Sequence, residues 1–201
     1  MCFVCVYCRQ TRFVDWRYFL GTLSVGVDRS LNALMQFKVG DFVVHSAYGL
    51  GQVVTLQKKQ LSEGEARLYY EVATQKNNVW VPVDSAATGT LRALTTKADL
   101  NRFKEVLRAK PQPLNVDRRV RQTEINERLK RGSFQTICEV VRDLTALGWR
   151  KPLGEADSAL LRRATDTLCQ EWAAAANSTM LVAQQQISAL IAESKQAYLS
   201  Q

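Results

Sequence analysis

The sequence has little histidine and proline and no long apolar run. It contains 1 histidine and 4 prolines in 201 residues. Because no stretch of about 18 consecutive apolar residues is present, we expect no membrane-spanning helix. No P-loop, G-x-S-x-G nucleophile elbow or H-E-x-x-H zinc motif occurs. His45 has no nucleophile beside it and completes no catalytic constellation, so we expect neither enzymatic activity nor a cofactor.

Acidic residues are outnumbered by basic ones. The chain has 27 Lys and Arg against 19 Asp and Glu, which gives a formal net charge of +8. The sequence pI is about 9.4. This excess favours nucleic acid or another polyanion as a partner. The alternative is a solvated surface that is basic without having such a partner.

The cysteines are too few and too unevenly spaced for a disulfide framework. Cys138 and Cys169 fall on half-apolar helical patterns, so we interpret them as reduced core residues in a reducing cytosol. Cys2, Cys5 and Cys8 have the C-x-x-C-x-x-C spacing of a zinc or iron–sulfur ligand run. No fourth ligand stands near them in the sequence, so a metal site is the least favoured interpretation of this segment.

Residues 1–34 lack clear periodicity, and Met35 stands immediately before the first predicted strand. We favour the hypothesis that translation starts at Met35. A disordered leader is the second interpretation, ahead of the metal site. A secretory signal fits poorly, because Asp15 and Asp28 interrupt the segment and no apolar core precedes a small-residue cleavage site.

Residues 35–94 have the composition of a small β domain. Phe42–Val44, Gln52–Leu56, Arg67–Ala73 and Val79–Val83 are rich in β-forming residues. Two glycines in Tyr48-Gly-Leu-Gly51 favour a tight corner between the first two strands, and Ser62–Glu65 reads as a hairpin turn. Pro82 puts the last strand at a sheet edge. We predict a small SH3- or Tudor-like β-barrel.

From Thr95 onward the apolar residues recur with a helical period. Thr96 with Asp99 forms a capping-box pattern, Gly148–Gly154 reads as a turn, and Asn177 or Ser178 is the expected cap of the last helix. We therefore predict a compact bundle of about five helices over residues 95–201 and an α+β fold for the whole chain. We expect Trp172 to lie in the bundle core. For Trp149 three positions stay open: the core, the seam between the two domains, or a contact with DNA.

The β segment resembles the start of the CarD/CdnL family, whose first domain is shared with the polymerase-interacting module of transcription-repair coupling factors. The family pattern is roughly F-x-x-G-D-x-V-V-Y-P-x-H-G-x-G-x-V, followed by V-P-x-x-x-A. The matching residues are Phe37, Gly40, Asp41, Val43, Val44, Gly49, Gly51, Val53, Val81, Pro82 and Ala86. Here His45-Ser46 replaces the Tyr-Pro of the family pattern. Tyr48 replaces the histidine that precedes the first glycine of the corner. A second block, Glu139–Leu144, resembles the helical half, so the resemblance covers roughly residues 35–195.

The resemblance implies that the β domain binds the β subunit of RNA polymerase. By alignment, the family's two basic polymerase-binding positions hold Lys59 and Trp80 here, and Pro82 lies beside them. An outward tryptophan on an edge strand is typical of a binding hot spot, and a partner strand would add to that edge. The alternative is that Trp80 packs onto the helical domain.

The resemblance also implies that the helical domain holds promoter DNA upstream of the −10 element. The family has a W-x-R-R-Y-[KR] pattern whose tryptophan wedges into the minor groove, and here the stretch reads Val116-Asp-Arg-Arg-Val-Arg121. Val116 stands at the wedge position. Basic residues then follow along the predicted helix and would contact phosphates. The candidates are Arg118, Arg119, Arg121, Lys130 and Arg131. The alternative is a solvated helix with ion pairs to Glu124 and Glu127.

We hypothesise a bacterial, cytoplasmic and monomeric transcription regulator that binds the polymerase β subunit and promoter DNA and stabilises the open complex. The competing hypothesis is a protein-interaction adaptor that uses the edge strand of the barrel and binds no DNA. The missing tryptophan at position 116 favours the adaptor, and the clustered arginines favour the regulator.

Overall fold

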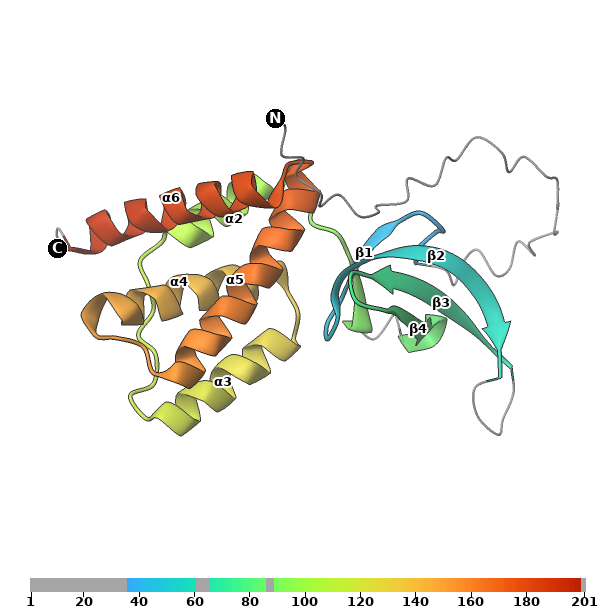
Figure 1. Cartoon of the computed structure of the whole chain (residues 1–201), viewed down its shortest axis with the longest axis horizontal. Coiled ribbons are helices and arrows are strands. Elements are labelled where there is room, and N and C mark those ends of the chain that lie inside the picture. Colours follow the sequence, from blue (N-terminus) through green and yellow to red (C-terminus); the bar gives the residue numbers. More distant parts are fainter. Residues whose placement is uncertain (1–35, 61–65, 86–88, 200–201) are drawn as a thin grey trace, which may run out of the picture. The chain divides into compact units, whose positions relative to one another are not determined.

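The computed structural model describes residues 36–60, 66–85 and 89–199. The expectations for residues 1–34, including the cysteine run, and for the turn at residues 62–65 lie outside the described residues. A five-stranded antiparallel sheet comes first and helices follow (Figure 1), which confirms the α+β class and the order of its two parts. No helix of the described part of the chain is long and apolar enough to cross a membrane.

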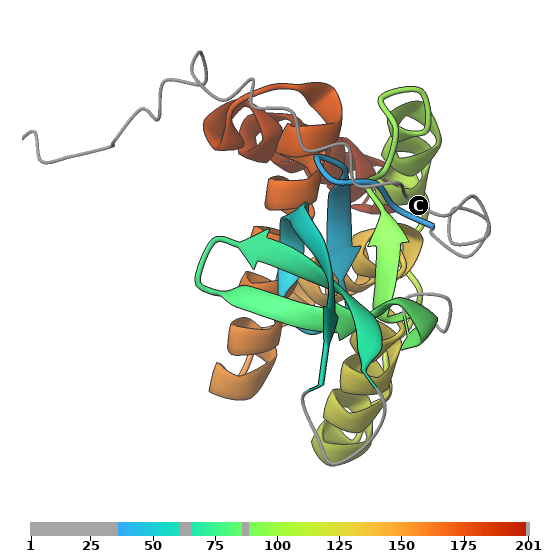
Figure 2. The ribbon, with the colours of Figure 1, turned by 90° about the vertical axis from the view of Figure 1, so that its right-hand side faces the viewer.

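The sheet has the strand order β4-β3-β2-β1-β5 and curves strongly (Figure 2). β5 is absent from the sequence-based assignment, because three residues are too few to establish an alternating pattern. It pairs antiparallel with β1, where Val44 faces Arg92. The strands are β1 Phe42–His45, β2 Gly49–Lys59, β3 Arg67–Thr74, β4 Asn78–Pro82 and β5 Leu91–Ala93.

The glycine corner between β1 and β2 is present, and its two glycines serve different purposes. Gly49 adopts φ +76°, a conformation that side chains disfavour. At Gly51 the limit is space, because an added Cβ would lie 2.6 Å from Cγ1 of Val72 and 2.9 Å from the carbonyl oxygen of Ala73. The glycine at position 51 therefore lets β2 approach β3 closely.

One face of the sheet forms a small hydrophobic core. Val43, Val53, Tyr70 and Val72 are almost completely buried there. The Phe37 ring meets the Tyr70 ring edge-on, with 6.0 Å between centroids. Because side chains alternate between the faces of a strand, burying these residues leaves Tyr69 and Glu71 on the opposite, outer face of β3.

In the described part of the chain, five longer helices follow the sheet, as predicted. Phe103, Phe134 and Trp172 pack together in their core, and the Phe103 and Phe134 rings meet edge-on at 4.8 Å. Trp172 is fully buried and its indole N–H donates to Gln186, so its predicted core position is confirmed. The helices are the short α1 Val83–Ser85, then α2 Leu100–Arg108, α3 Arg118–Lys130, α4 Phe134–Arg150, α5 Glu155–Ala176 and α6 Met180–Leu199.

Two predicted helix ends are wrong. The expected turn at residues 148–154 is shorter, because α4 continues through Gly148 to Arg150, with Leu153 packing over the glycine at an ordinary contact distance. Asn177 ends α5 in a left-handed conformation and does not cap α6. Thr179 is the cap, since its hydroxyl accepts the Val182 N–H at 3.3 Å.

Candidate interaction surfaces

The first candidate surface is the outer face of the sheet at its β4 edge. Trp80 pairs with Glu71 of β3 in the strand register, and Pro82 pairs with Tyr69. These residues share the face opposite the buried Tyr70 and Val81. β4 ends the strand order, so the predicted edge position is confirmed, and a proline is tolerated because its missing N–H interrupts no ladder.

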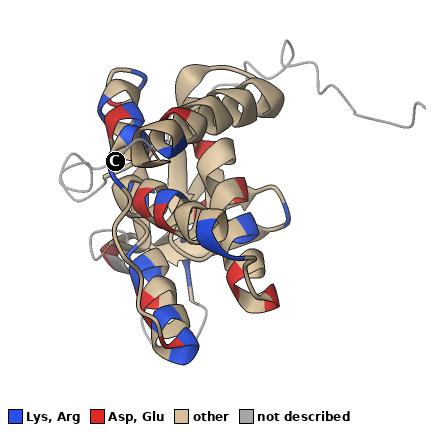
Figure 3. Cartoon of the chain, turned by 90° about the vertical axis from the view of Figure 1, so that its left-hand side faces the viewer, with Lys and Arg blue, Asp and Glu red and all other residues tan. Residues whose placement is uncertain are grey.

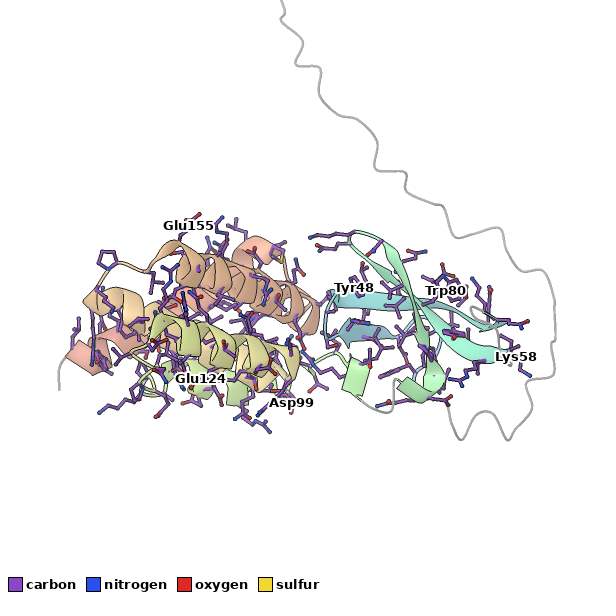
Figure 4. All side chains as sticks on the ribbon, turned by 90° about the horizontal axis from the view of Figure 1, so that it is seen from below. Tyr48, Lys58, Trp80, Asp99, Glu124 and Glu155 are labelled. Carbon is purple, nitrogen blue, oxygen red and sulfur yellow. The ribbon has the colours of Figure 1, made fainter. Side chains whose placement is uncertain are left out.

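Lys59 of β2 reaches across β3 to Trp80. Its Nζ lies 3.2 Å from the centroid of the indole ring, which is a cation–π contact. The structure thus brings together two residues that are 21 positions apart in sequence. Both were predicted to belong to one polymerase-binding surface, which requires them to lie close together. Both side chains are half-buried, and Figure 4 shows Trp80 on the sheet.

The second candidate surface lies at the N-terminal end of α3. Val116 is 90% exposed immediately before the helix, although a valine is apolar. Asp117 caps the helix by accepting the Val120 N–H at 2.9 Å, and Arg118 and Arg119 follow in exposed positions. The cap therefore fixes the helix start directly between an exposed apolar residue and two exposed cations.

Arg121 does not belong to this surface. It is only 5% exposed, and its Nη2 lies 2.6 Å from Oδ2 of the buried Asp157 on α5. Its Nη1 donates to the carbonyl oxygens of Asn115 at 2.7 Å and Val116 at 3.2 Å. The predicted phosphate contact is thus replaced by a structural role, in which Arg121 holds the segment that presents Val116.

Lys130 and Arg131 lie at the opposite end of α3, exposed to solvent. At 1.5 Å rise per residue, Lys130 is about 18 Å along the axis from Arg118. Lys130 pairs with Glu127 at 2.8 Å, both partners exposed. The bonding lowers the pKa of the Glu127 carboxyl, chiefly through the Lys130 hydrogen bond. This end of α3 resembles the solvated, ion-paired helix of the alternative interpretation.

Two further cations lie at the end of α4, and no role was predicted for them. Arg150 and Lys151 end α4 in exposed positions. Gly154, three residues beyond Lys151, lies beside Arg118, since a Cβ added there would be 4.0 Å from the guanidinium carbon. We use the name basic end for Val116, Arg118, Arg119, Arg150 and Lys151.

Aromatic rings support the α4 side of the basic end. Trp149 packs against Tyr198 of α6 with 5.8 Å between ring centroids. The guanidinium of Arg150 lies 5.2 Å from the same tyrosine ring. Trp149 is thus half-buried and packs within the helical part against α6, outside the core cluster, and a contact with DNA stays a prediction. Figure 3 shows that Lys, Arg, Asp and Glu are distributed over several helices of the chain.

The remaining titratable candidates have structural surroundings. Nδ1 of His45 accepts the backbone N–H groups of Ala47 at 3.0 Å and Tyr48 at 3.4 Å, and burial lowers its pKa. Cys138 and Cys169 are buried, unbridged core residues, as predicted, and burial raises the pKa of both thiols. Within the described ranges, no group of His, Cys, Asp and Glu could hold a metal ion.

Comparison with known proteins supplies matches for both parts of the chain. Residues 37–95 match the family model described as the CarD-like/TRCF RID domain, and residues 102–188 match the model described as the CarD C-terminal domain. The chain is also 24% identical over 137 residues to a Bacillus subtilis (strain 168) protein named "Putative transcription factor YdeB". That alignment covers 67% of this chain and 89% of the relative.

Proposed function

Because the chain belongs to the CarD family and therefore has a transcription-related role, we propose that it binds the β subunit of RNA polymerase and promoter DNA at the same time. In this proposal, the sheet contacts the polymerase. The helical part contacts DNA just upstream of the −10 element, and the two contacts together stabilise the open complex. The proposal includes no chemical step, in keeping with the regulatory kind of both matched domains.

The polymerase contact is supported by the β4 edge. An edge strand offers unpaired backbone groups to which an extended segment of a partner can add. Beside that edge, the Trp80 ring and the Lys59 ammonium group are in contact and form one apolar and cationic surface. Because the contact already restricts both side chains, little side-chain entropy would be lost when a partner binds. Pro82 interrupts the donor row of β4, so an added strand would have to bond to the residues before it.

The DNA contact is supported by the basic end, which is the single observation that carries the proposal. An exposed apolar side chain at Val116 is flanked by exposed Arg118 and Arg119, and the exposed Arg150 and Lys151 precede the connection whose Gly154 lies beside Arg118. Minor-groove proteins insert an apolar wedge and hold the adjacent phosphates with cations. Valine lacks a flat ring for stacking on a base, so the phosphate contacts carry most of the proposed affinity.

The proposed mechanism is a shift of population between closed and open promoter complexes. A protein that binds the open complex more tightly raises its fraction by the ratio of the two affinities. A coupling free energy of about 1–3 kcal/mol would change the equilibrium roughly 5–150-fold. Promoter choice would come from the polymerase, because contacts to phosphates carry no sequence information.

The deciding experiment measures the lifetime of the open complex on a ribosomal-type promoter, with purified polymerase and with or without this protein. Wild type is compared with Trp80→Ala and with the double variant Arg118→Gln/Arg119→Gln. We expect a longer lifetime with wild type and a loss of that effect with each variant. An unchanged lifetime with polymerase binding intact would instead favour the adaptor that binds no DNA.

A further inference from the structure

The two parts of the chain between residues 36 and 199 keep separate hydrophobic cores. One cluster holds the sheet residues around Val53, Tyr70 and Val72, and the other holds the helical residues around Leu144, Leu168 and Trp172. The contacts between the sheet and the helices include polar ones that join residues far apart in sequence. Gln170 of α5, for example, donates to Gln75 in the β3–β4 turn at 3.3 Å.

The strongest of these polar contacts is an ion pair between β5 and α5. Nη1 and Nη2 of Arg92 lie 2.5 and 2.6 Å from Oε1 and Oε2 of Glu171, which is a two-pronged arrangement. The Glu171 side chain is 1% exposed and that of Arg92 26%. Two parallel hydrogen bonds fix the orientation of the guanidinium relative to the carboxylate as well as the distance between them. A single hydrogen bond would fix only the distance.

Two further groups complete the ion pair. Nε of Arg92 donates to the carbonyl oxygen of Gly132 at 2.6 Å. This hydrogen bond connects β5 to the turn between α3 and α4. The Thr95 hydroxyl donates to Oε1 of Glu171 at 2.7 Å. Gly132 itself adopts φ +68°, and a Cβ there would lie 3.5 Å from Cβ of Ser46 in the β1–β2 corner. One arginine therefore binds the sheet to α5 and to the end of α3.

We propose that Arg92 and Glu171 are positioning residues that hold the sheet and the helical bundle in one fixed orientation. We name Arg92, Thr95, Gly132 and Glu171 the joint. The joint bonds directly to the turn that ends α3, and α3 carries Arg118 and Arg119. It thereby sets the direction in which the basic end points relative to the β4 edge. The functional part of this inference rests on the proposed function.

A fixed orientation matters because two contacts made together must match two sites that are already spaced apart. A rigid connection gives a high effective concentration for the second contact, whereas a loose one spreads the second surface over many positions. Loss of the joint should therefore leave each surface able to bind alone. The stabilisation that comes from binding both partners at once should be lost.

The first test measures orientation directly, with residual dipolar couplings of backbone amides in the weakly aligned, isotopically labelled full chain. In wild type we expect one alignment tensor to fit both the sheet and the bundle. In Arg92→Gln and in Glu171→Gln we expect two different tensors. Should a variant lose its dispersed amide spectrum, Thr95→Val removes one hydroxyl donor from the joint and supplies a milder case. A single tensor in folded variants would overturn the proposal.

The second test asks whether orientation serves function. The affinities of Arg92→Gln for the polymerase β subunit and for promoter DNA, each measured alone, should equal those of wild type, while the gain in open-complex lifetime should be lost. A full gain in lifetime would overturn the functional part. Should wild type itself give no gain, the proposed function fails, and the dipolar couplings still decide whether the joint sets the orientation.

Arg108→Gln is the matched control. Arg108 of α2 also forms a close ion pair, with Nε 2.6 Å from Oε2 of Glu193 on α6, but both partners lie within the helical bundle. The substitution is chemically identical to Arg92→Gln. It should preserve the single tensor and the open-complex lifetime, and loss of either would show that the assay responds to any broken ion pair.

Discussion

Nζ of Lys59 lies 3.2 Å from the centroid of the Trp80 ring, over the outer face of the sheet. The contact restrains both long side chains before any partner arrives, so less side-chain entropy remains to be lost on binding. It also presents a cation on an indole ring, a combination suited to an acidic and partly apolar partner surface. We therefore expect Lys59 and Trp80 to contribute most of the binding energy at the β4 edge.

Trp80→Ala should weaken binding to the polymerase β subunit by a factor of about 30, which corresponds to about 2 kcal/mol for a tryptophan hot spot. The substitution removes the indole and leaves Lys59 without its ring. Calorimetric titration of the full chain with the β subunit measures the change. An affinity equal to that of wild type would place the polymerase contact elsewhere.

Lys59→Gln should weaken the same binding less than Trp80→Ala, because it removes the charge and leaves the ring. Lys58→Gln is the matched control, since Lys58 is the adjacent residue of β2 and points to the other face of the strand. Equal losses from the two lysine substitutions would indicate a general effect of net charge instead of a contact at Trp80.

Arg118→Gln and Arg119→Gln should each lower affinity for promoter DNA and reduce the salt dependence of binding. Each lost phosphate contact lowers the slope of log K against log salt by about 1. Fluorescence anisotropy at several salt concentrations measures both quantities. Lys130→Gln serves as the comparison, because Lys130 lies at the far end of α3 and is paired with Glu127. A slope that Lys130→Gln lowers as much would extend the DNA surface along the whole helix.

Arg121→Gln should destabilise the fold instead of weakening one phosphate contact. Removing one partner of a buried ion pair costs about 3–5 kcal/mol, because the other charge stays buried, here that of Asp157. Urea unfolding measures the loss. Arg119→Gln, the same change at an exposed position of the same helix, should stay within about 0.5 kcal/mol of wild type. Equal stability of the two variants would contradict the structural role of Arg121.

The contrast between Arg118 and Arg121 shows where sequence reasoning reaches its limit. Residues three apart on a helix lie near one face, so both arginines were assigned to the phosphate contacts. Arg121 turns inward because Asp157, 36 residues later, provides a buried carboxylate. Nothing local to α3 encodes that partner. The same limit applies to Arg150 and Lys151, because the approach of Gly154 to Arg118 depends on how α5 packs.

Regular elements are more predictable because their signals are local. Alternation in Arg67–Ala73 and a proline at position 82 predicted β3 and the edge position of β4, both of which the structure confirms. The three-residue β5 carries no comparable pattern, yet it bears Arg92. The sequence therefore identifies most strands and helices, whereas the joint depends on a strand too short to recognise and a carboxylate 79 residues away.

Stability should fall as pH drops from about 8 to about 5, with a contribution from His45. Burial lowers the pKa of His45 in the folded chain from its ordinary value of 6.5. Below about pH 6.5 the unfolded chain takes up a proton that the folded chain resists, so protonation favours unfolding. His45→Asn keeps an acceptor for the Ala47 and Tyr48 amides and cannot titrate there. Chemical denaturation across this range should show that the free energy of unfolding falls less steeply with pH in the variant than in wild type. Identical slopes would mean that His45 does not contribute to the pH dependence.

Gly51→Ala should destabilise the sheet by about 1–3 kcal/mol, the usual cost of overpacking. The added methyl would lie 2.9 Å from the Ala73 carbonyl oxygen, which is backbone and cannot rotate away, so β2 and β3 would have to separate. Gly148→Ala is the informative counterpart. Gly148 lies in α4 with Leu153 at a tolerable 3.5 Å, so the change should stabilise the chain by up to about 1 kcal/mol through helix propensity. Urea unfolding of both variants should give free-energy changes of opposite sign. A Gly51→Ala chain as stable as wild type would contradict the close approach of β2 to β3.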